Sequence, residues 1–150
     1  MEGAKVLDLY CGSSALGIEA LSRGATHVTF VDRSFYCMEA VQKSLRELGA
    51  DASRWELVRA EAMTALRKFR RNEEPFDLVL LDPPYGHELA RKMLIALNQY
   101  AIVSLAGIVV AEHDKREHLP PRLDHDADAA MVLKRQERYG DTVLTFFERQ

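Results

Sequence analysis

The chain has 150 residues, of which 47% are hydrophobic and 29% are charged, and its formal net charge is -3 at pH 7. This length suits one domain that buries about 68–70% of the surface of its unfolded chain. Phosphate contacts require Lys and Arg, so an isoelectric point near 6.0 excludes a protein that grips nucleic acid by bulk electrostatics.

Targeting and cysteine patterns narrow the class further. No apolar stretch approaches the roughly 20 residues that a membrane-spanning helix needs, and the start from Met1 to Lys5 lacks the apolar segment of a secretory signal. We therefore expect a cytoplasmic protein with no membrane partner. Cys11 and Cys37 are too far apart for a CxxC pair, which argues against a disulfide framework or a structural zinc site.

Strand-like and helical runs alternate from the first residues onward, which is the pattern of a parallel sheet wrapped by helices. Strands are expected at 4–10, 27–32, 55–58, 76–81 and 108–111, and helices at 15–23, 35–48, 60–69 and about 88–103. Two helical stripes predict core positions; they comprise Met38, Val41, Leu45 and Leu48 in one helix and Met93, Leu94 and Leu97 in the other.

The C-terminal part follows another pattern. After Pro120-Pro121, two strand-like runs flank Tyr139-Gly140-Asp141, and the Gly-Asp pair marks a hairpin. The chain shows no internal repeat or linker, so we expect a single α/β domain.

A small-residue turn follows the first strand. Gly12 removes the side chain that would keep a ligand away from the backbone, and the free N–H groups of the helix that follows favour an anionic group. Ser14 stands where the dinucleotide pattern G-x-G-x-x-G would have glycine. This loop alone is therefore a weak indication of a ligand site.

Asp32 ends the second strand. In a doubly wound fold, an acid at this place can accept both hydrogen bonds of a ribose diol. Asp is also a favoured N-cap residue, so Asp32 could simply cap the helix expected from Phe35. The glycine loop before it favours the ribose interpretation.

The four residues Asp82-Pro83-Pro84-Tyr85 follow the apolar run 76–81. Each proline lacks an N–H and pushes the preceding residue toward extended geometry, so a stiff loop presents a carboxylate and an aromatic ring at a strand end. Such loops often carry function, and this one could hold a planar amino group. The alternative is a plain connection between a strand and a helix.

His113, between Glu112 and Asp114, raises the question of a metal site. The other histidines are scattered along the chain, which argues against a metal site built from several of them. We therefore expect no metal and regard these residues as a capped strand end near the substrate entrance.

Together, these features resemble a class I S-adenosylmethionine-dependent methyltransferase. More closely, the chain resembles the RsmD family of bacterial 16S rRNA guanine-N2 methyltransferases, long labelled N6-adenine-specific methylases. The likeness covers essentially the whole chain. It is carried by Asp8-Leu9-Tyr10-Cys11-Gly12-Ser13, Gly17-Ile18-Glu19-Ala20-Leu21-Ser22-Arg23-Gly24-Ala25, Leu81-Asp82-Pro83-Pro84-Tyr85-Gly86, Glu112-His113-Asp114 and Arg138-Tyr139-Gly140-Asp141-Thr142.

The resemblance implies one Rossmann-like methyltransferase domain over residues 1–150, with a mostly parallel seven-stranded sheet and a C-terminal antiparallel hairpin. It implies S-adenosylmethionine as cofactor, with the loop from Asp8 to Gly12 around the methionine part, Asp32 on the ribose and Glu61 near the adenine. The implied cofactor-binding set is Asp8, Tyr10, Gly12, Ser13, Asp32, Arg33, Glu61 and Ala62, and the implied catalytic set is Asp82, Pro83 and Tyr85.

Two residues and one segment depart from the family pattern. Aspartate is common where this chain has Glu61, and glycine is common where it has Ser14. Relatives also carry a basic segment of some tens of residues before the first strand, which helps engage RNA, whereas here that strand begins almost at Met1. We expect cofactor binding to survive this difference better than rRNA methylation.

The implied partner is 16S rRNA in the small ribosomal subunit or its assembly intermediate, methylated at the exocyclic N2 amine of a guanine by a monomeric enzyme. Alternatives remain open. A DNA adenine-N6 methyltransferase uses the same Asp-Pro-Pro-Tyr loop, a protein or small-molecule methyltransferase is compatible with it, and a cofactor-binding core without activity would need neither substrate.

Overall fold

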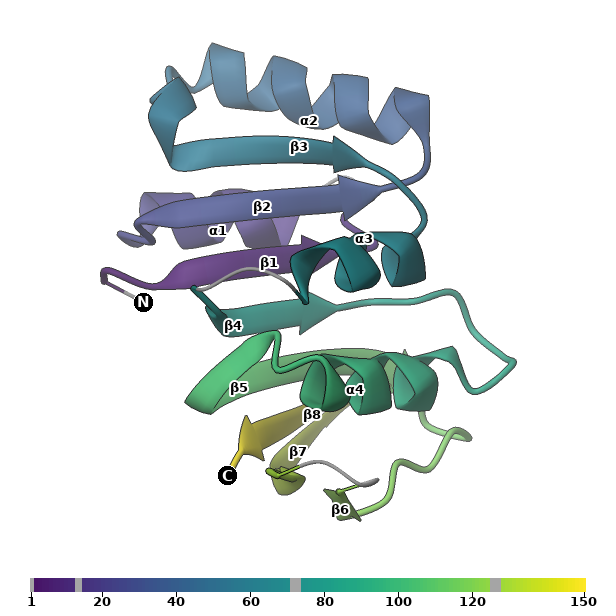
Figure 1. Ribbon diagram of the computed structural model, residues 1–150. Helices are drawn as coiled ribbons and strands as arrows, with labels where there is room; N and C mark the ends of the chain where they lie inside the picture. The colour runs from purple at the N-terminus through teal and green to yellow at the C-terminus, as the bar shows by residue number, and fades with distance from the viewer. Residues whose placement is uncertain (1, 13–14, 71–73, 125–127) are drawn as a thin grey trace.

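The computed structural model describes residues 2–12, 15–70, 74–124 and 128–150. Eight strands form one sheet in the order β3-β2-β1-β4-β5-β8-β7-β6 (Figure 1). The strands are β1 Lys5–Leu9, β2 His27–Asp32, β3 Trp55–Arg59, β4 Phe76–Leu81, β5 Val103–Asp114, β6 Arg122–Leu123, β7 Met131–Tyr139 and β8 Thr142–Arg149, and the helices are α1 Ala15–Ser22, α2 Phe35–Glu47, α3 Ala62–Phe69 and α4 Leu89–Gln99.

The first five strands of the chain are parallel, while β8 lies antiparallel between β5 and β7. The predicted mixed α/β fold with a mostly parallel sheet and an antiparallel C-terminal hairpin is therefore confirmed. The sheet has one strand more than expected. The additional β6 consists of Arg122 and Leu123, which pair with Val132 and Met131; a two-residue strand has too little periodicity to be recognised in a sequence.

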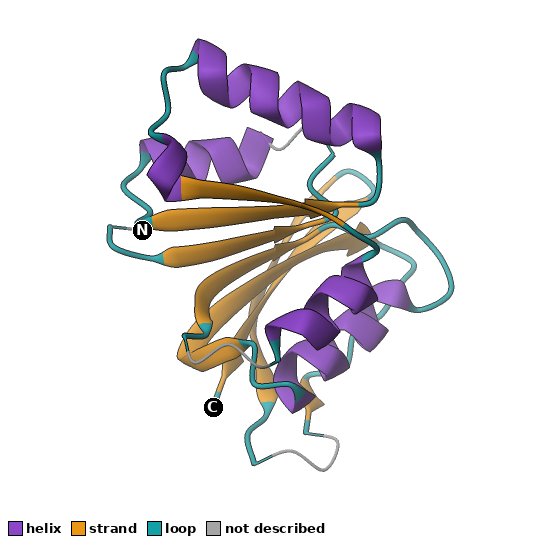
Figure 2. Ribbon diagram, turned by 45° about the horizontal axis from the view of Figure 1, so that its top comes forward, coloured by secondary structure: helices purple, strands orange, loops and turns teal. Residues whose placement is uncertain are grey.

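The helices cover opposite faces of the sheet: α1 and α2 lie on one side, and α3 and α4 lie on the other (Figure 2). Two apolar cores result. Val6, Val28 and Phe30 pack toward α1 and α2, whereas Leu7 and Leu9 pack toward α3 and α4, because side chains of a strand alternate between its faces. The strand order reverses at β1: β2 and β3 are added on one side of it, and β4 and β5 on the other. Ligands of open α/β sheets bind at such a point, beyond the carboxyl ends of the strands.

Most of the predicted core positions are buried in these helices, but Leu48 is not. Leu48 follows the end of α2 as its C-cap and is 65% exposed. The helical conformation ends at Gly49, which has a positive φ of 68°, so the last position of the stripe lies beyond the helix and does not face the core.

The boundary between α4 and β5 also differs from prediction. The helix ends at Gln99 rather than near residue 103, and β5 starts at Val103 rather than Ile108. Val103 pairs with Phe76, and the register shifts before Ile108 pairs with Leu78. The first part of β5 is irregular, with Ala106 at φ 65°, so it lacks the alternation by which a strand is recognised in a sequence. Its pairing also depends on β4, which is distant in the sequence.

In the part of the chain that the structure describes, no helix has the length and apolar character needed to cross a membrane.

Candidate active site

Three strand ends converge on one cleft. Leu9 of β1 pairs with Val31 of β2 on one side and with Leu81 of β4 on the other. The next residues along the three strands are Tyr10, Asp32 and Asp82, so these follow one another along the same edge of the sheet. They line a cleft of about 610 Å³, which is large enough for a small-molecule ligand.

The cleft brings together most of the predicted site residues. Eight of them line it: Tyr10, Asp32, Arg33, Glu61, Ala62, Asp82, Pro83 and Tyr85. Asp8 and Gly12 do not line this cleft, and Ser13 lies outside the described residues. The cleft also has four lining residues that the predicted site set lacks: Val31, Ala60, Pro84 and Leu89. Leu89 is the first residue of α4 and lies four positions after Tyr85, so the apolar start of that helix was its only sequence signal.

The glycine loop and the acidic strand end are one hydrogen-bonded unit. The N–H of Gly12 donates to Oδ2 of Asp32 (3.2 Å), and the N–H of Ser34 donates to Oδ1 (2.9 Å). The N-cap of α2 is Ser34, whose hydroxyl accepts from the N–H of Cys37 (3.3 Å). The interpretation of Asp32 as the N-cap of this helix is therefore wrong, because Ser34 occupies the capping position.

Tyr10 has a strained backbone at the mouth of the cleft. Its φ of 60° lies in the left-handed region, which costs a residue with a side chain about 1 kcal/mol or more and is concentrated at functional sites. Partial burial, followed by the Glu61 carboxylate, raises the pKa of the Tyr10 hydroxyl. The phenol is therefore neutral at physiological pH and is available as a hydrogen-bond donor.

Asp8 lies in a second, smaller hollow of about 160 Å³, whose lining it shares with Tyr10, Asp82 and Glu112. The residue is only 5% exposed, and its Oδ2 has no hydrogen-bond partner among the described residues. Burial raises the pKa of the Asp8 carboxyl to about 7; the backbone N–H of Gly17 opposes this effect, and the Asp82 and Asp32 carboxylates add to it. A buried carboxyl with one unpaired oxygen suits a cationic ligand group.

Asp82 belongs to both hollows, since it lines the large cleft and the small one. Its backbone N–H approaches the carbonyl of Leu9 at 3.5 Å, and the next residue, Pro83, is buried. Asp82 is exposed as a residue, but partial desolvation of its carboxyl, followed by repulsion from Glu112, raises the pKa of Asp82 to about 6. The aromatic ring of Tyr85 is left 61% exposed, so it is free to contact a ligand.

The sequence matches one family over nearly its whole length. The family described as "Conserved hypothetical protein 95" matches residues 1–148. A relative from Bacillus subtilis (strain 168), named "Putative rRNA methyltransferase YlbH", is 34% identical over 99% of this chain and 78% of the relative. The chain belongs to this RsmD-like family of methyltransferases.

Other relatives agree with the RsmD-like assignment. "Ribosomal RNA small subunit methyltransferase D" from Buchnera aphidicola subsp. Acyrthosiphon pisum (strain APS) is 27% identical over 79% of this chain and 60% of the relative. A solved structure described as a conserved hypothetical protein from Streptococcus pyogenes is 31% identical, covers 100% of this chain and 88% of that chain, and superimposes with a TM-score of 0.87. The chain thus spans three fifths of the Buchnera aphidicola relative and about nine tenths of the Streptococcus pyogenes protein.

Within the part of the chain that the structure describes, Glu61 keeps its carboxylate free for a ligand. It is the N-cap residue of α3, but its side chain makes no capping hydrogen bond. Arg33, on the same cleft wall, is exposed, and its carbonyl accepts a long hydrogen bond from Nε of Arg59 (3.5 Å). A carboxylate and a guanidinium therefore flank the β2 and β3 side of the cleft.

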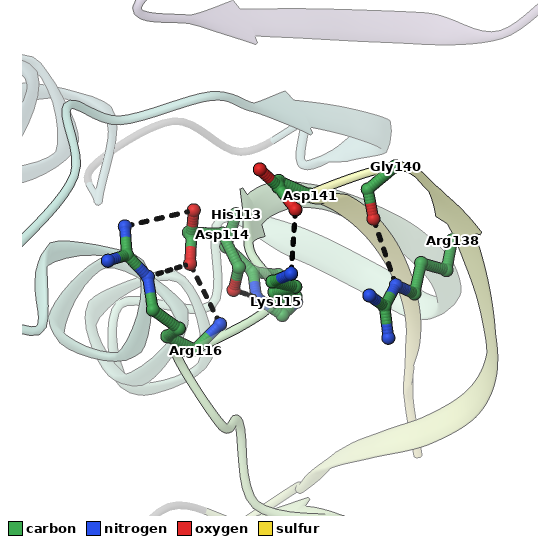
Figure 3. Close-up of polar contacts among 7 residues, drawn as sticks. All are labelled: His113, Asp114, Lys115, Arg116, Arg138, Gly140 and Asp141. Carbon is green, nitrogen blue, oxygen red and sulfur yellow. Dashed lines mark hydrogen bonds and ion pairs between the residues drawn. The ribbon is translucent and has the colours of Figure 1, made fainter.

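The segment 112–114 and the segment 138–142 meet at the C-terminal end of β5 (Figure 3). Lys115 Nζ lies 2.8 Å from Asp141 Oδ1, and Arg116 Nε donates to Oδ1 of Asp114 (2.8 Å). Arg138 Nε donates to the carbonyl of Gly140 (2.9 Å). Gly140 and Asp141 form the two-residue turn between β7 and β8, which confirms the predicted hairpin.

His113 is not at a substrate entrance, contrary to expectation. It is 2% exposed, and its Nε2 lies 2.7 Å from Oγ1 of Thr145 on β8, while Nδ1 lies 3.1 Å from the carbonyl of Asp114. As neighbours in β5, His113 and Glu112 point to opposite faces of the sheet. Among the described residues, no three or more His, Cys, Asp or Glu side chains gather to hold a metal ion.

Proposed function

We propose that this chain transfers a methyl group from S-adenosylmethionine to the exocyclic N2 amine of a guanine in 16S rRNA of the small ribosomal subunit, acting as a monomer. The observation that carries the proposal is the position of Asp82. Its carboxyl lies at the wall shared by two hollows, one of which suits the cofactor, and both hollows are built from a single chain.

The residues present fit S-adenosylmethionine. Asp8 offers a buried and unpaired carboxylate oxygen to the ammonium of the methionine part, Asp32 offers acceptors to the ribose diol, and Glu61 stands at the β3 end of the cleft for the adenine amine. When bound, this cofactor supplies an electrophilic methyl group on a sulfonium. The acidic lining also favours a cationic ligand electrostatically.

Asp82 and Pro83 would hold the acceptor amine. The lone pair of an exocyclic amine is delocalised into the ring, which makes the nitrogen a poor nucleophile. If the Asp82 carboxylate accepts one N–H and the carbonyl of Pro83 accepts the other, the nitrogen becomes more tetrahedral and its lone pair is directed. Correct positioning of two reactants can lower a barrier by roughly 7–11 kcal/mol.

The proton balance needs no strong base. Formation of the new N–C bond, with the breaking bond's electron pair left on sulfur, makes the amine acidic, and one N–H proton can then pass to Asp82 or to water. A carboxyl with a pKa of about 6 is mostly ionised at pH 7.5, so it can accept the hydrogen bond first and the proton later. Tyr85 would stack on the base, which contributes about 1–3 kcal/mol in single-stranded nucleic-acid sites.

The substrate class rests on the relatives. The proteins from Bacillus subtilis and Buchnera aphidicola are named as rRNA methyltransferases, the latter for the small subunit. The amine of a paired guanine is hidden in the duplex, so its nucleotide must be unstacked or lie in a loop. An acidic chain with net charge -3 would engage such a nucleotide through local contacts.

Nucleoside mass spectrometry tests the proposal directly. The purified chain is incubated with labelled S-adenosylmethionine and, separately, with naked 16S rRNA, assembled small subunits and duplex DNA, each unmethylated. We expect N2-methylguanosine, with small-subunit particles as the best substrate. N6-methyladenosine in DNA, or label in neither RNA sample, would overturn the assignment. Size-exclusion chromatography with light scattering tests the monomer.

A further inference from the structure

Asp82 and Glu112 occupy equivalent places at the ends of adjacent strands. Leu81 of β4 pairs with Ala111 of β5, so the next residue of each strand follows in the same register. Neighbouring parallel strands are about 4.8 Å apart, and both carboxylates line the hollow of about 160 Å³. Two acidic side chains thus face the same small space from neighbouring strands.

Glu112 lacks a counterion of its own. Within the described chain its carboxylate has no hydrogen bond or ion pair, although the residue is half-buried. The two cations that directly follow β5 in the chain, Lys115 and Arg116, are engaged by Asp141 and Asp114 (Figure 3). Its repulsion with Asp82 is therefore not relieved from within the described structure, and the pair can accept two hydrogen bonds from a ligand.

We propose that Glu112 selects guanine over adenine by accepting the N1–H of the base while Asp82 accepts a hydrogen of the adjacent N2 amine. The inference rests on the proposed function and names the base-reading residue of the same site. Guanine presents N1–H and N2–H side by side on its pairing edge, so two adjacent carboxylates are complementary to it.

Adenine offers the opposite arrangement next to its amine. If the adenine N6 amine is placed on Asp82, the ring atom N1 is an acceptor and faces the Glu112 carboxylate. Two acceptors then meet beside the half-buried Glu112 side chain, and neither satisfies the other. Sites that depend on a hydrogen bond from the substrate can reject an analogue without it by a factor of about 10⁴–10⁵, and an unfavourable contact with the wrong partner is an efficient source of specificity.

The test is Glu112→Gln, which keeps the shape of the side chain but removes its charge and adds an N–H donor. Glu148→Gln is the matched control, because Glu148 is also half-buried but lies on β8 opposite Ile108, toward the other end of the sheet. Thermal unfolding of both variants verifies that they are folded. N2-methylguanosine and N6-methyladenosine are then quantified on small-subunit particles and 16S rRNA.

With Glu112→Gln we expect the rate of N2-methylguanosine formation to fall about tenfold, since a hydrogen bond to a charged group is replaced by one between neutral groups. Adenine methylation should become detectable, because the amide can donate to adenine N1. The Glu148→Gln protein should match the wild type in both products. These changes in product ratio would not follow from a general structural defect.

Binding gives a readout that does not need turnover. The protein saturated with S-adenosylhomocysteine is titrated, with NMR detection, with the 5′-monophosphates of guanosine, inosine and 2-aminopurine riboside. Inosine keeps N1–H without the amine, and 2-aminopurine keeps the amine without N1–H. The Glu112→Gln change should weaken binding of guanosine and inosine monophosphate about tenfold. It should strengthen binding of the 2-aminopurine nucleotide, because N1 of this base is an acceptor and then meets an amide donor instead of a carboxylate.

The two proposals fail in different ways. If the wild-type protein forms no N2-methylguanosine, the proposed substrate is overturned and the inference with it. If wild type and Glu112→Gln form N2-methylguanosine at the same rate, with no adenine product and unchanged nucleotide affinities, only the role of Glu112 is overturned.

Discussion

The backbone N–H of Gly12 donates a 3.2 Å hydrogen bond to Oδ2 of Asp32, which joins the loop after β1 to the end of β2. The same carboxylate accepts the N–H of Ser34 through Oδ1 (2.9 Å). Asp32 is therefore oriented by the backbone before any ligand arrives, and each of its oxygens keeps a lone pair for a further hydrogen bond.

Replacing Asp32 with Ala should weaken cofactor binding at least tenfold, or about 1.4 kcal/mol. The change removes both the ribose acceptors and the support of the Gly12 loop. Calorimetric titration with S-adenosylhomocysteine measures the affinity, and Glu39→Ala, an exposed carboxylate of α2, serves as control. Equal affinities for Asp32→Ala and wild type would contradict the ribose role.

Replacing Asp82 with Ala should reduce kcat at least a hundredfold while the affinity for S-adenosylhomocysteine changes less than threefold. The reason is that Asp82 holds the acceptor amine rather than the cofactor. A variant that loses both properties equally would show that Asp82 belongs to the cofactor site instead.

Turnover should also depend on pH through Asp82. Its pKa is raised to about 6, so the carboxylate that accepts the amine N–H forms as the pH rises from 5 to 7. The value of kcat/KM for RNA should rise about tenfold over this range in the wild type and then level off, because kcat/KM reports ionisations of the protein before RNA binds. A flat profile between pH 5 and 7 would rule out Asp82 as the acceptor.

Asp8→Asn should stabilise the ligand-free protein at pH 8. The pKa of Asp8 is about 7 in the folded state and about 3.9 in an unfolded chain, so the folded state binds the proton more tightly. Folding stability therefore falls as the pH rises from about 4 to about 7, and the loss is complete above 7. The isosteric amide of Asp8→Asn does not ionise and so avoids this loss. Its free energy of unfolding at pH 8 should therefore exceed that of the wild type by about 2–4 kcal/mol.

Urea unfolding at pH 8 and pH 4 measures this difference. At pH 4 the wild-type carboxyl is largely protonated in the folded state, so the two proteins should agree within about 1 kcal/mol. Glu39→Gln, at an exposed position, should change neither value. An Asp8→Asn protein that is less stable than wild type at pH 8 would show that the charged form of Asp8 is already compensated in the ligand-free fold.

Tyr85→Ala should lower kcat/KM for RNA by a factor of about 10–100, which corresponds to the loss of one stacked base at about 1–3 kcal/mol. Tyr85→Phe keeps the ring and should stay within threefold of the wild type. Because the side chain is 61% exposed, neither change should shift the midpoint of urea unfolding appreciably. A Phe variant as impaired as the Ala variant would assign the effect to the hydroxyl instead.

The sequence alone determined the architecture and most of the cleft. Apolar strand-like runs that alternate with helical stripes specify a doubly wound sheet, and Asp32 and Asp82 could be placed at its edge because parallel strands end on the same side. The tight hairpin at Gly140 was also readable, since turn residues act locally.

Tertiary structure decided what depends on distant neighbours. The adjacency of Asp82 and Glu112 follows from the register between β4 and β5, and the irregular start of β5 follows from its pairing with Phe76. The burial that raises the pKa of Asp8 to about 7 likewise depends on packing around β1. Register and desolvation arise from contacts between segments far apart in the chain, so local sequence patterns could not specify them.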